Sequence, residues 1–96
     1  MKLVLIVYGA ALEAQVLEAL ERIGANTYTK LPRIHGVGTH SPPHLDTHVW
    51  PGTNNGLLIA TDEESKDRIL KEIGGLKAAH QREGIKAFVM PVEEIL

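Results

Sequence analysis

Continuous apolar stretches and one alternating stretch along the chain predict four strands. The apolar segments 3–8, 56–60 and 85–90 ("LVLIVY", "GLLIA" and "IKAFVM") predict strands, of which the first is covered on both faces, by the same chain or by a partner subunit. Residues 26–34 alternate β-branched, aromatic and polar side chains, which predicts a further strand. Pro32 has no amide hydrogen to donate, so the end of this strand should lie at a sheet edge or a bulge.

Two segments have the apolar spacing of amphipathic helices. In residues 11–23 the apolar side chains recur every three to four positions, and Glu13 belongs to the set assigned to the solvent side. The segment 61–64 ("TDEE") predicts a capping box, in which the threonine and the last glutamate bond free amides at the start of a second helix. This helix should weaken or bend at Gly74–Gly75 and end at Gly84.

The order strand, helix, strand, strand, helix, strand predicts an α+β fold of the ferredoxin-like βαββαβ type. Its antiparallel sheet carries two helices on one face. We therefore expect a single domain of residues 1–96, with a long loop at 35–55 between the second and third strands. Because the strands of so short a chain are apolar on both sides, the open sheet face should be buried by further copies of the chain.

Composition excludes several classes of function. The chain has 96 residues, with ten basic and twelve acidic side chains and a net charge of -2, so it lacks the basic excess that binding to nucleic acid requires. It has no cysteine, which excludes disulfides, thiolate metal sites and cysteine nucleophiles. The first apolar segment is far shorter than the roughly 20 residues of a membrane span. We expect a cytoplasmic protein with no membrane insertion.

Four of the five histidines lie in residues 34–52, "IHGVGTHSPPHLDTHVWPG". In an extended chain His44, Asp46 and His48 project from the same side, with neighbours about 6 to 7 Å apart. Two imidazoles and a carboxylate at this spacing can converge on one metal ion if the segment bends. The sequence therefore predicts a metal site in this loop.

Two further histidines, His40 and His35, would complete the coordination shell of this site. Imidazole and carboxylate ligands suit Zn, Cu, Ni or Fe better than Ca or Mg, which prefer oxygen ligands. Binding should weaken below roughly pH 6, where histidines become protonated. Trp50 carries a large apolar surface and should anchor the loop against the domain or a neighbouring subunit.

A metal held by His40, His44 and His48 with one open position would have the ligands of a hydrolytic zinc site. The sequence offers no nucleophile motif, and Asp46 is the only clear candidate for a general base. We therefore expect a protein that is not an enzyme, and a metal-dependent hydrolase is the last of three hypotheses.

Three segments resemble the PII signal-transduction proteins. The C-terminal "GIKAFVMPVEEIL", residues 84–96, is similar to the last strand of that family, where a lysine and an apolar strand precede a similar Pro-Val-Glu-Glu. "GVG" at 36–38 resembles the Gly-aromatic-Gly that opens the PII T-loop. "TDEESKDRILKEI" at 61–73 lies where the family's second helix begins.

The resemblance to PII implies a homotrimer that binds adenine nucleotides in its lateral clefts. Each cleft lies between the T-loop base of one subunit and the turn before the last strand. The matching positions place Gly36 and Gly38 at the T-loop base and Lys86 at a phosphate-contacting lysine. Backbone amides and an ammonium group together suit a phosphate. The CutA-type divalent-cation-tolerance proteins are similar in their trimeric ferredoxin-like architecture alone.

These observations support a leading hypothesis and an alternative. In the first, the chain is a trimeric PII-like sensor whose loop at 35–55 binds a transition metal, together with a small ligand in the cleft between subunits. Ligand binding would order the loop and change what it presents to a protein partner. In the alternative, the chain is a PII-type signalling adaptor for ATP or ADP, and the histidines only shape the loop.

Overall fold

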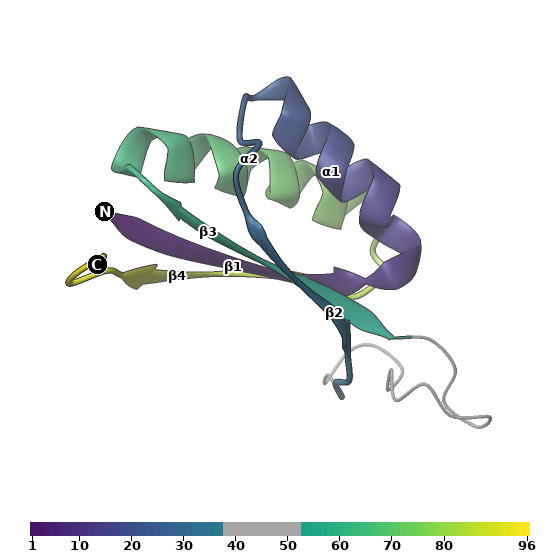
Figure 1. The fold of residues 1–96 in the computed structure, drawn as a ribbon. Helices are drawn as coiled ribbons and strands as arrows, with labels where there is room; N and C mark the ends of the chain where they lie inside the picture. The colour runs from purple at the N-terminus through teal and green to yellow at the C-terminus, as the bar shows by residue number, and fades with distance from the viewer. Residues whose placement is uncertain (38–52) are drawn as a thin grey trace.

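The computed structural model describes residues 1–37 and 53–96, which form one antiparallel sheet with two helices on one face (Figure 1). The strands lie in the order β2-β3-β1-β4. This arrangement confirms the predicted α+β, ferredoxin-like fold. In chain order the elements are β1 (Lys2–Gly9), the 3-10 helix η1 (Ala10–Leu12), α1 (Glu13–Arg22), β2 (Thr29–Ile34), β3 (Asn54–Thr61), α2 (Glu63–Ala79) and β4 (Ile85–Pro91).

The two chain ends lie side by side at one end of the sheet, where β1 begins and β4 ends (Figure 1). The amide of Val92 donates to the carbonyl of Met1 at 3.2 Å, which joins the segment after β4 to the start of β1. Among the described residues, no helix has the length and hydropathy of a membrane span.

The central strand β1 supplies the middle of the hydrophobic core. Val4, Ile6 and Tyr8 point toward the helices and are fully buried, whereas the residues between them are half-buried on the opposite face. The described residues therefore cover one face of this strand, and the predicted cover of its other face lies outside them. Both helices and the neighbouring strands contribute further buried side chains to this core. They are Leu12, Val16, Leu20, Leu57, Ile59, Ile69, Ile73 and Ile85.

The sheet face away from the helices is apolar, and no other segment of residues 1–37 and 53–96 covers it. Leu5 pairs with Leu58 on one side and with Phe88 on the other, so an apolar row crosses three strands. Phe88, Met90 and Leu31 are 48, 39 and 38 % exposed. These large apolar side chains would be shielded from water if another copy of the chain packed on this face.

The start of α2 differs from the predicted capping box. Asp62 is the N-cap residue, and its carboxylate accepts the amide of Ser65 at 2.7 Å. Thr61 is instead the last residue of β3 and pairs with Lys2 of β1. Because the sheet holds Thr61 in an extended conformation, the helix begins one residue later than the sequence motif suggested.

The helix α2 continues through Gly74–Gly75 and runs without interruption to Ala79. The predicted weak point does not break the observed helix, and the predicted end at Gly84 is wrong. His80 leaves the helical conformation with φ -127° and ψ 59°. The carbonyl of Gly84 accepts the amide of Gly9 at 2.9 Å, so the residues after the helix form the turn into β4.

The segment predicted as one helix at 11–23 begins with the 3-10 turn η1 and continues as α1. Gly24 ends it with φ +76°, a conformation that favours glycine. The second strand is shorter than the predicted 26–34, because β2 begins at Thr29.

The expected edge position of β2 is confirmed. In the described part of the chain this strand pairs with β3 alone, and its register shifts between Leu31 and Ile34, around Pro32. A proline at this point costs no ladder hydrogen bond, because the strand edge is open and the pairing is already interrupted.

The burial of Ile6 in the core predicts how its replacement changes stability. Replacing Ile6 with alanine should lower the free energy of unfolding by roughly 2 to 5 kcal/mol, because the side chain is fully buried and would leave a cavity. Urea unfolding at fixed protein concentration measures this change. The control Glu18→Ala, on the exposed side of α1, should stay within about 0.5 kcal/mol of the wild type. Equal effects of the two substitutions would contradict the assigned core.

Candidate functional site

The candidate site is the end of the sheet from which the connection between β2 and β3 departs. Here β2 ends at Ile34, and β3 begins at Asn54. Backbone bonds tie this end to its surroundings, since the amide of Ala10 donates to the carbonyl of Thr53 at 2.9 Å. We call residues 33–36 and 53–55, with the side chains that bond to them, the loop base.

A partly buried polar network centred on Glu13 lies at the loop base. The carboxylate oxygen Oε1 accepts the hydroxyl of Tyr8 at 2.9 Å and the amide Nδ2 of Asn55 at 3.1 Å. The ammonium group of Lys30 lies 2.8 Å from Oε1 and donates to Oε2 at 2.9 Å. One carboxylate at the start of α1 therefore joins side chains of β1, β2 and β3.

The network extends to the backbone of β2. The side-chain oxygen Oδ1 of Asn55 accepts the amide of Arg33 at 3.1 Å. Arg33 has φ +56°, in the left-handed region, and this conformation costs a non-glycine residue roughly 1 to 2 kcal/mol. The bond from Asn55 offsets part of this cost. It also fixes the irregular turn of the strand just before Gly36.

The contacts of the network shift the pKa values of Glu13 and Tyr8. The hydrogen bond from Lys30 is the largest of the effects that hold the pKa of Glu13 below its ordinary value of 4.5. Burial, with a further contribution from the bond to Glu13, raises the pKa of the Tyr8 hydroxyl well above its usual range. At neutral pH the carboxylate is therefore charged and the phenol is a neutral donor, which is the pairing that the geometry requires.

The residues predicted to bind phosphate lie at opposite edges of the sheet. Gly36 follows the edge strand β2, and a Cβ atom there would meet the side-chain nitrogen of Asn54 at 3.0 Å. Lys86 is exposed near the start of the other edge strand, β4, where it pairs with Val7. Three strand spacings, about 14 Å, separate the two edges. One chain therefore does not bring Gly36 and Lys86 together, and Gly38 lies outside the described residues.

Of the predicted metal ligands, His35 lies within the described residues. His35 is exposed just after β2. Within residues 1–37 and 53–96, no three histidine, aspartate or glutamate side chains are grouped so that they could hold a metal ion. The remaining candidates lie outside the described residues. They are His40, His44, Asp46 and His48, and the predicted anchor Trp50 lies there as well.

The sequence interpretation missed the network at the loop base. It assigned Glu13 to the solvent side of a helix, whereas the structure places the Glu13 carboxylate against a buried phenol and a buried amide. The available signal was Asn55, a polar residue at the start of an apolar strand. Asn55 is only 7 % exposed, so its amide needs partners within the protein.

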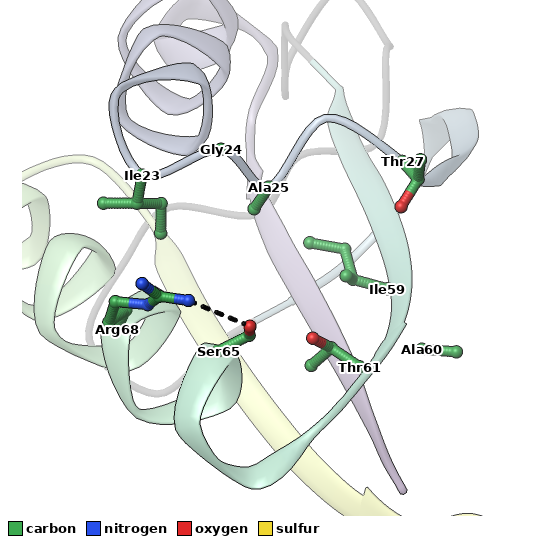
Figure 2. A pocket seen from close by; sticks show the side chains of 9 residues that line it. All are labelled: Ile23, Gly24, Ala25, Thr27, Ile59, Ala60, Thr61, Ser65 and Arg68. Carbon is green, nitrogen blue, oxygen red and sulfur yellow. Dashed lines mark hydrogen bonds between the residues drawn. The ribbon is translucent and has the colours of Figure 1, made fainter.

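A small recess lies at the other end of β3, beside the first turn of α2 (Figure 2). Its polar lining includes Thr27, Thr61 and Arg68, and the Arg68 guanidinium donates to Ser65 Oγ at 3.2 Å. Its volume is about 110 Å³, whereas pockets for drug-sized ligands have about 300 Å³ or more. This recess could hold water molecules or a small ion, but it is too small for a nucleotide.

Comparisons with known proteins bear on the whole chain. The family described as "Nitrogen regulatory protein P-II" matches residues 1–96. A PII-like signaling protein from Thermus thermophilus is 30 % identical, with a TM-score of 0.66 over 93 % of this chain and 83 % of that one. Among curated proteins, none matches.

A second set of similar structures is CPII, a nitrogen regulatory PII-like protein from Thiomonas intermedia. Its structure bound to ADP and bicarbonate is 20 % identical, with a TM-score of 0.70 over 97 % of this chain and 88 % of that one. The apo form is 18 % identical, with a TM-score of 0.65 over 95 % of this chain and 89 % of that one. These likenesses concern the fold.

The Glu13 network predicts a pH dependence of stability. Because the native pKa of Glu13 is lowered, its carboxylate stabilises the folded state at pH values above the ordinary 4.5. This contribution is lost as the pH falls through the lower native value. Glu13→Gln should therefore melt a few degrees below the wild type at neutral pH, and the difference should shrink below pH 4.5.

Melting curves between neutral and acidic pH measure this difference. Glu18→Gln, on the exposed side of the same helix, controls for the loss of one negative charge and should melt close to the wild type at neutral pH. A gap between Glu13→Gln and the wild type that persists undiminished at the acidic end would contradict the prediction.

Proposed function

The chain belongs to the nitrogen regulatory protein P-II family, and we propose that it works as a homotrimeric regulatory protein that responds to adenine nucleotides. The observation that carries the proposal is the position of the two phosphate-binding candidates. Gly36 and Lys86 lie at opposite edges of one sheet, as two halves of a site built between copies would. The family is one of regulatory proteins, so we propose no enzymatic activity.

A ring of copies would complete the site. In a ring built from heterologous contacts, one surface of each copy meets a different surface of the next copy. The β2 edge of one subunit can then face the β4 edge of its neighbour. The apolar sheet face, on which Phe88 and Met90 are exposed, supports this assembly because a ring would bury it. Three copies is the number that the family resemblance implies.

The proposed cleft would hold the phosphates of ATP or ADP between two subunits. Backbone amides near Gly36 and Gly38 would come from one subunit, and the ammonium group of Lys86 from the next. The CPII structures with bound ADP support a ligand of this class. The Glu13 network would hold the amides of the loop base in place. Binding would then change what the loop at 35–55 presents to a protein target.

If the proposed cleft binds ADP, Lys86 should contribute to the affinity. Replacing it with alanine should weaken ADP binding about ten- to a hundredfold, the equivalent of one hydrogen bond to a charged group. Isothermal titration calorimetry measures the affinity, and light scattering checks the oligomeric state. Lys77→Ala, an exposed lysine of α2, is the matched control and should bind ADP like the wild type. Equal affinities of all three proteins would exclude Lys86 from the site.

We propose metal sensing as a second function of the same protein, favoured by the four histidines in residues 34–52. The ligands would be His40, His44, Asp46 and His48, with His35 at the edge of the described part. Zn, Cu, Ni and Fe are the metals that such ligands prefer. This proposal rests on the amino-acid sequence. We do not propose the third hypothesis, a metal-dependent hydrolase, because no further observation favours it.

The metal hypothesis predicts a thermal shift of the metal-stripped protein. A metal at about a hundredfold excess over its Kd should stabilise the native state by about 2.7 kcal/mol. The shift should disappear in the double variant His44→Ala, His48→Ala and at about pH 5.5, where protonated imidazoles no longer bind metal. His80→Ala, at the end of α2, is the control. A shift that survives the double substitution would place the metal elsewhere.

A further inference from the structure

We infer that Glu13 is a positioning residue that selects the irregular register of β2 and so places the loop base for ligand binding. The inference deepens the proposed nucleotide function and rests on it for its ligand-binding consequence. Its structural part, which concerns the backbone at Arg33, stands on the hydrogen bonds of a single chain.

The first step is the attachment of β2. This strand is an edge strand, and all residues from Thr29 to Arg33 are exposed. It therefore buries less apolar surface than the central strand β1, and its ladder with β3 is interrupted after Leu31. The bond from Lys30 to Glu13 and the bond from the Arg33 amide to Asn55 tie it to the rest of the molecule. Both bonds depend on the Glu13 carboxylate, directly or through Asn55.

The second step concerns the two registers open to β2. The observed strand pairs regularly from Thr29 to Leu31, shifts, and resumes with Ile34 opposite Asn54. A strand without the shift would turn each later side chain to the other face of the sheet. The left-handed conformation of Arg33 is the point at which the two registers separate. Because the ladder with β3 is interrupted at this point, the contacts of Arg33 help to select the register.

The third step is how Glu13 makes this selection. Its Oε1 accepts the Nδ2 group of Asn55 and thereby orients the amide, so that the Asn55 oxygen faces the Arg33 amide. Tyr8 donates to the same carboxylate oxygen from the buried side. Without the negative charge, the oxygen that orients the Asn55 amide is a weaker acceptor, and the bond that favours the left-handed turn weakens. Glu13 acts on Gly36 through this chain of contacts.

Glu13 and Lys86 would therefore have different roles in ligand binding. Lys86 would contact a bound phosphate, whereas Glu13 would set where the Gly36 backbone lies. The close approach of Asn54 to Gly36 makes the position sensitive, since a Cβ atom there would already lie 3.0 Å from the Asn54 side chain. A change of the β2 register would move Gly36 relative to Asn54, which belongs to β3.

Amide hydrogen exchange at Arg33 tests the inference in the full-length protein. In Glu13→Gln the exchange rate of this amide should rise about tenfold or more, which corresponds to the loss of one charge-assisted network bond. Amides in the middle of β1, such as that of Ile6, should keep their protection. Lys30→Met should show the same local loss, and Lys30→Arg, which keeps the charge, should restore most of the protection.

Two results would overturn the inference. One is unchanged exchange at Arg33 in Glu13→Gln. The other is an equal loss of protection at Arg33 and in β1, which would mean that Glu13 stabilises the whole fold. If Glu13→Gln does not fold, the comparison of Lys30→Met with Lys30→Arg decides by the same criterion. Local loss at Arg33 in Lys30→Met, with rescue by arginine, supports the inference.

Measurements of ADP binding distinguish a failure of this inference from a failure of the proposed function. ADP should bind about tenfold more weakly to Glu13→Gln than to the wild type, while Lys86→Ala should weaken binding and leave exchange at Arg33 unchanged. A wild type that binds no ADP would overturn the proposed function, and the Arg33 amide would still decide the role of Glu13. Full ADP affinity in Glu13→Gln, with local loss at Arg33, would reject the consequence for binding.

Discussion

The structure depends on the burial of one face of β1. This strand is hydrogen-bonded to β3 and β4 on its two sides, and Val4, Ile6 and Tyr8 carry the core toward both helices. Because strand side chains alternate, the helices on one face cannot cover the side chains that point to the other face, and no other described segment covers them. The fold of the chain and the oligomeric assembly proposed for it thus have the same geometric origin.

The polar chemistry begins where this buried row ends. Tyr8 is the last buried side chain of β1 on the helix face, and its hydroxyl needs an acceptor because it lies out of reach of water. Glu13 provides that acceptor, and Lys30 and Asn55 complete the set of donors around its carboxylate. The core and the loop base are therefore physically continuous. A helix that packs on the sheet also fixes the strand from which the connection departs.

The functional arrangement that we propose lies between subunits. Within one chain, Gly36 and Lys86 belong to opposite edges, and the recess beside Arg68 is too small for a nucleotide. Association of copies would bury the apolar sheet face and would bring Gly36 of one copy near Lys86 of the next. This is a physical reason for so small a regulatory protein to work as an oligomer.

The sequence by itself determined the order of the elements, the fold class and the edge position of β2, because hydrophobic periodicity and the chemistry of proline act over a few neighbouring residues. It also indicated the family, chiefly through the segment at 84–96. Tertiary structure decided the rest. Asp62 replaces Thr61 as the helix cap, because β1 holds Thr61 in the sheet. Glu13 becomes the centre of a polar network, because partners 5, 17 and 42 residues away in the chain converge on one carboxylate. Local patterns contain no information about such distant partners, whose meeting depends on how the strands and the helix pack.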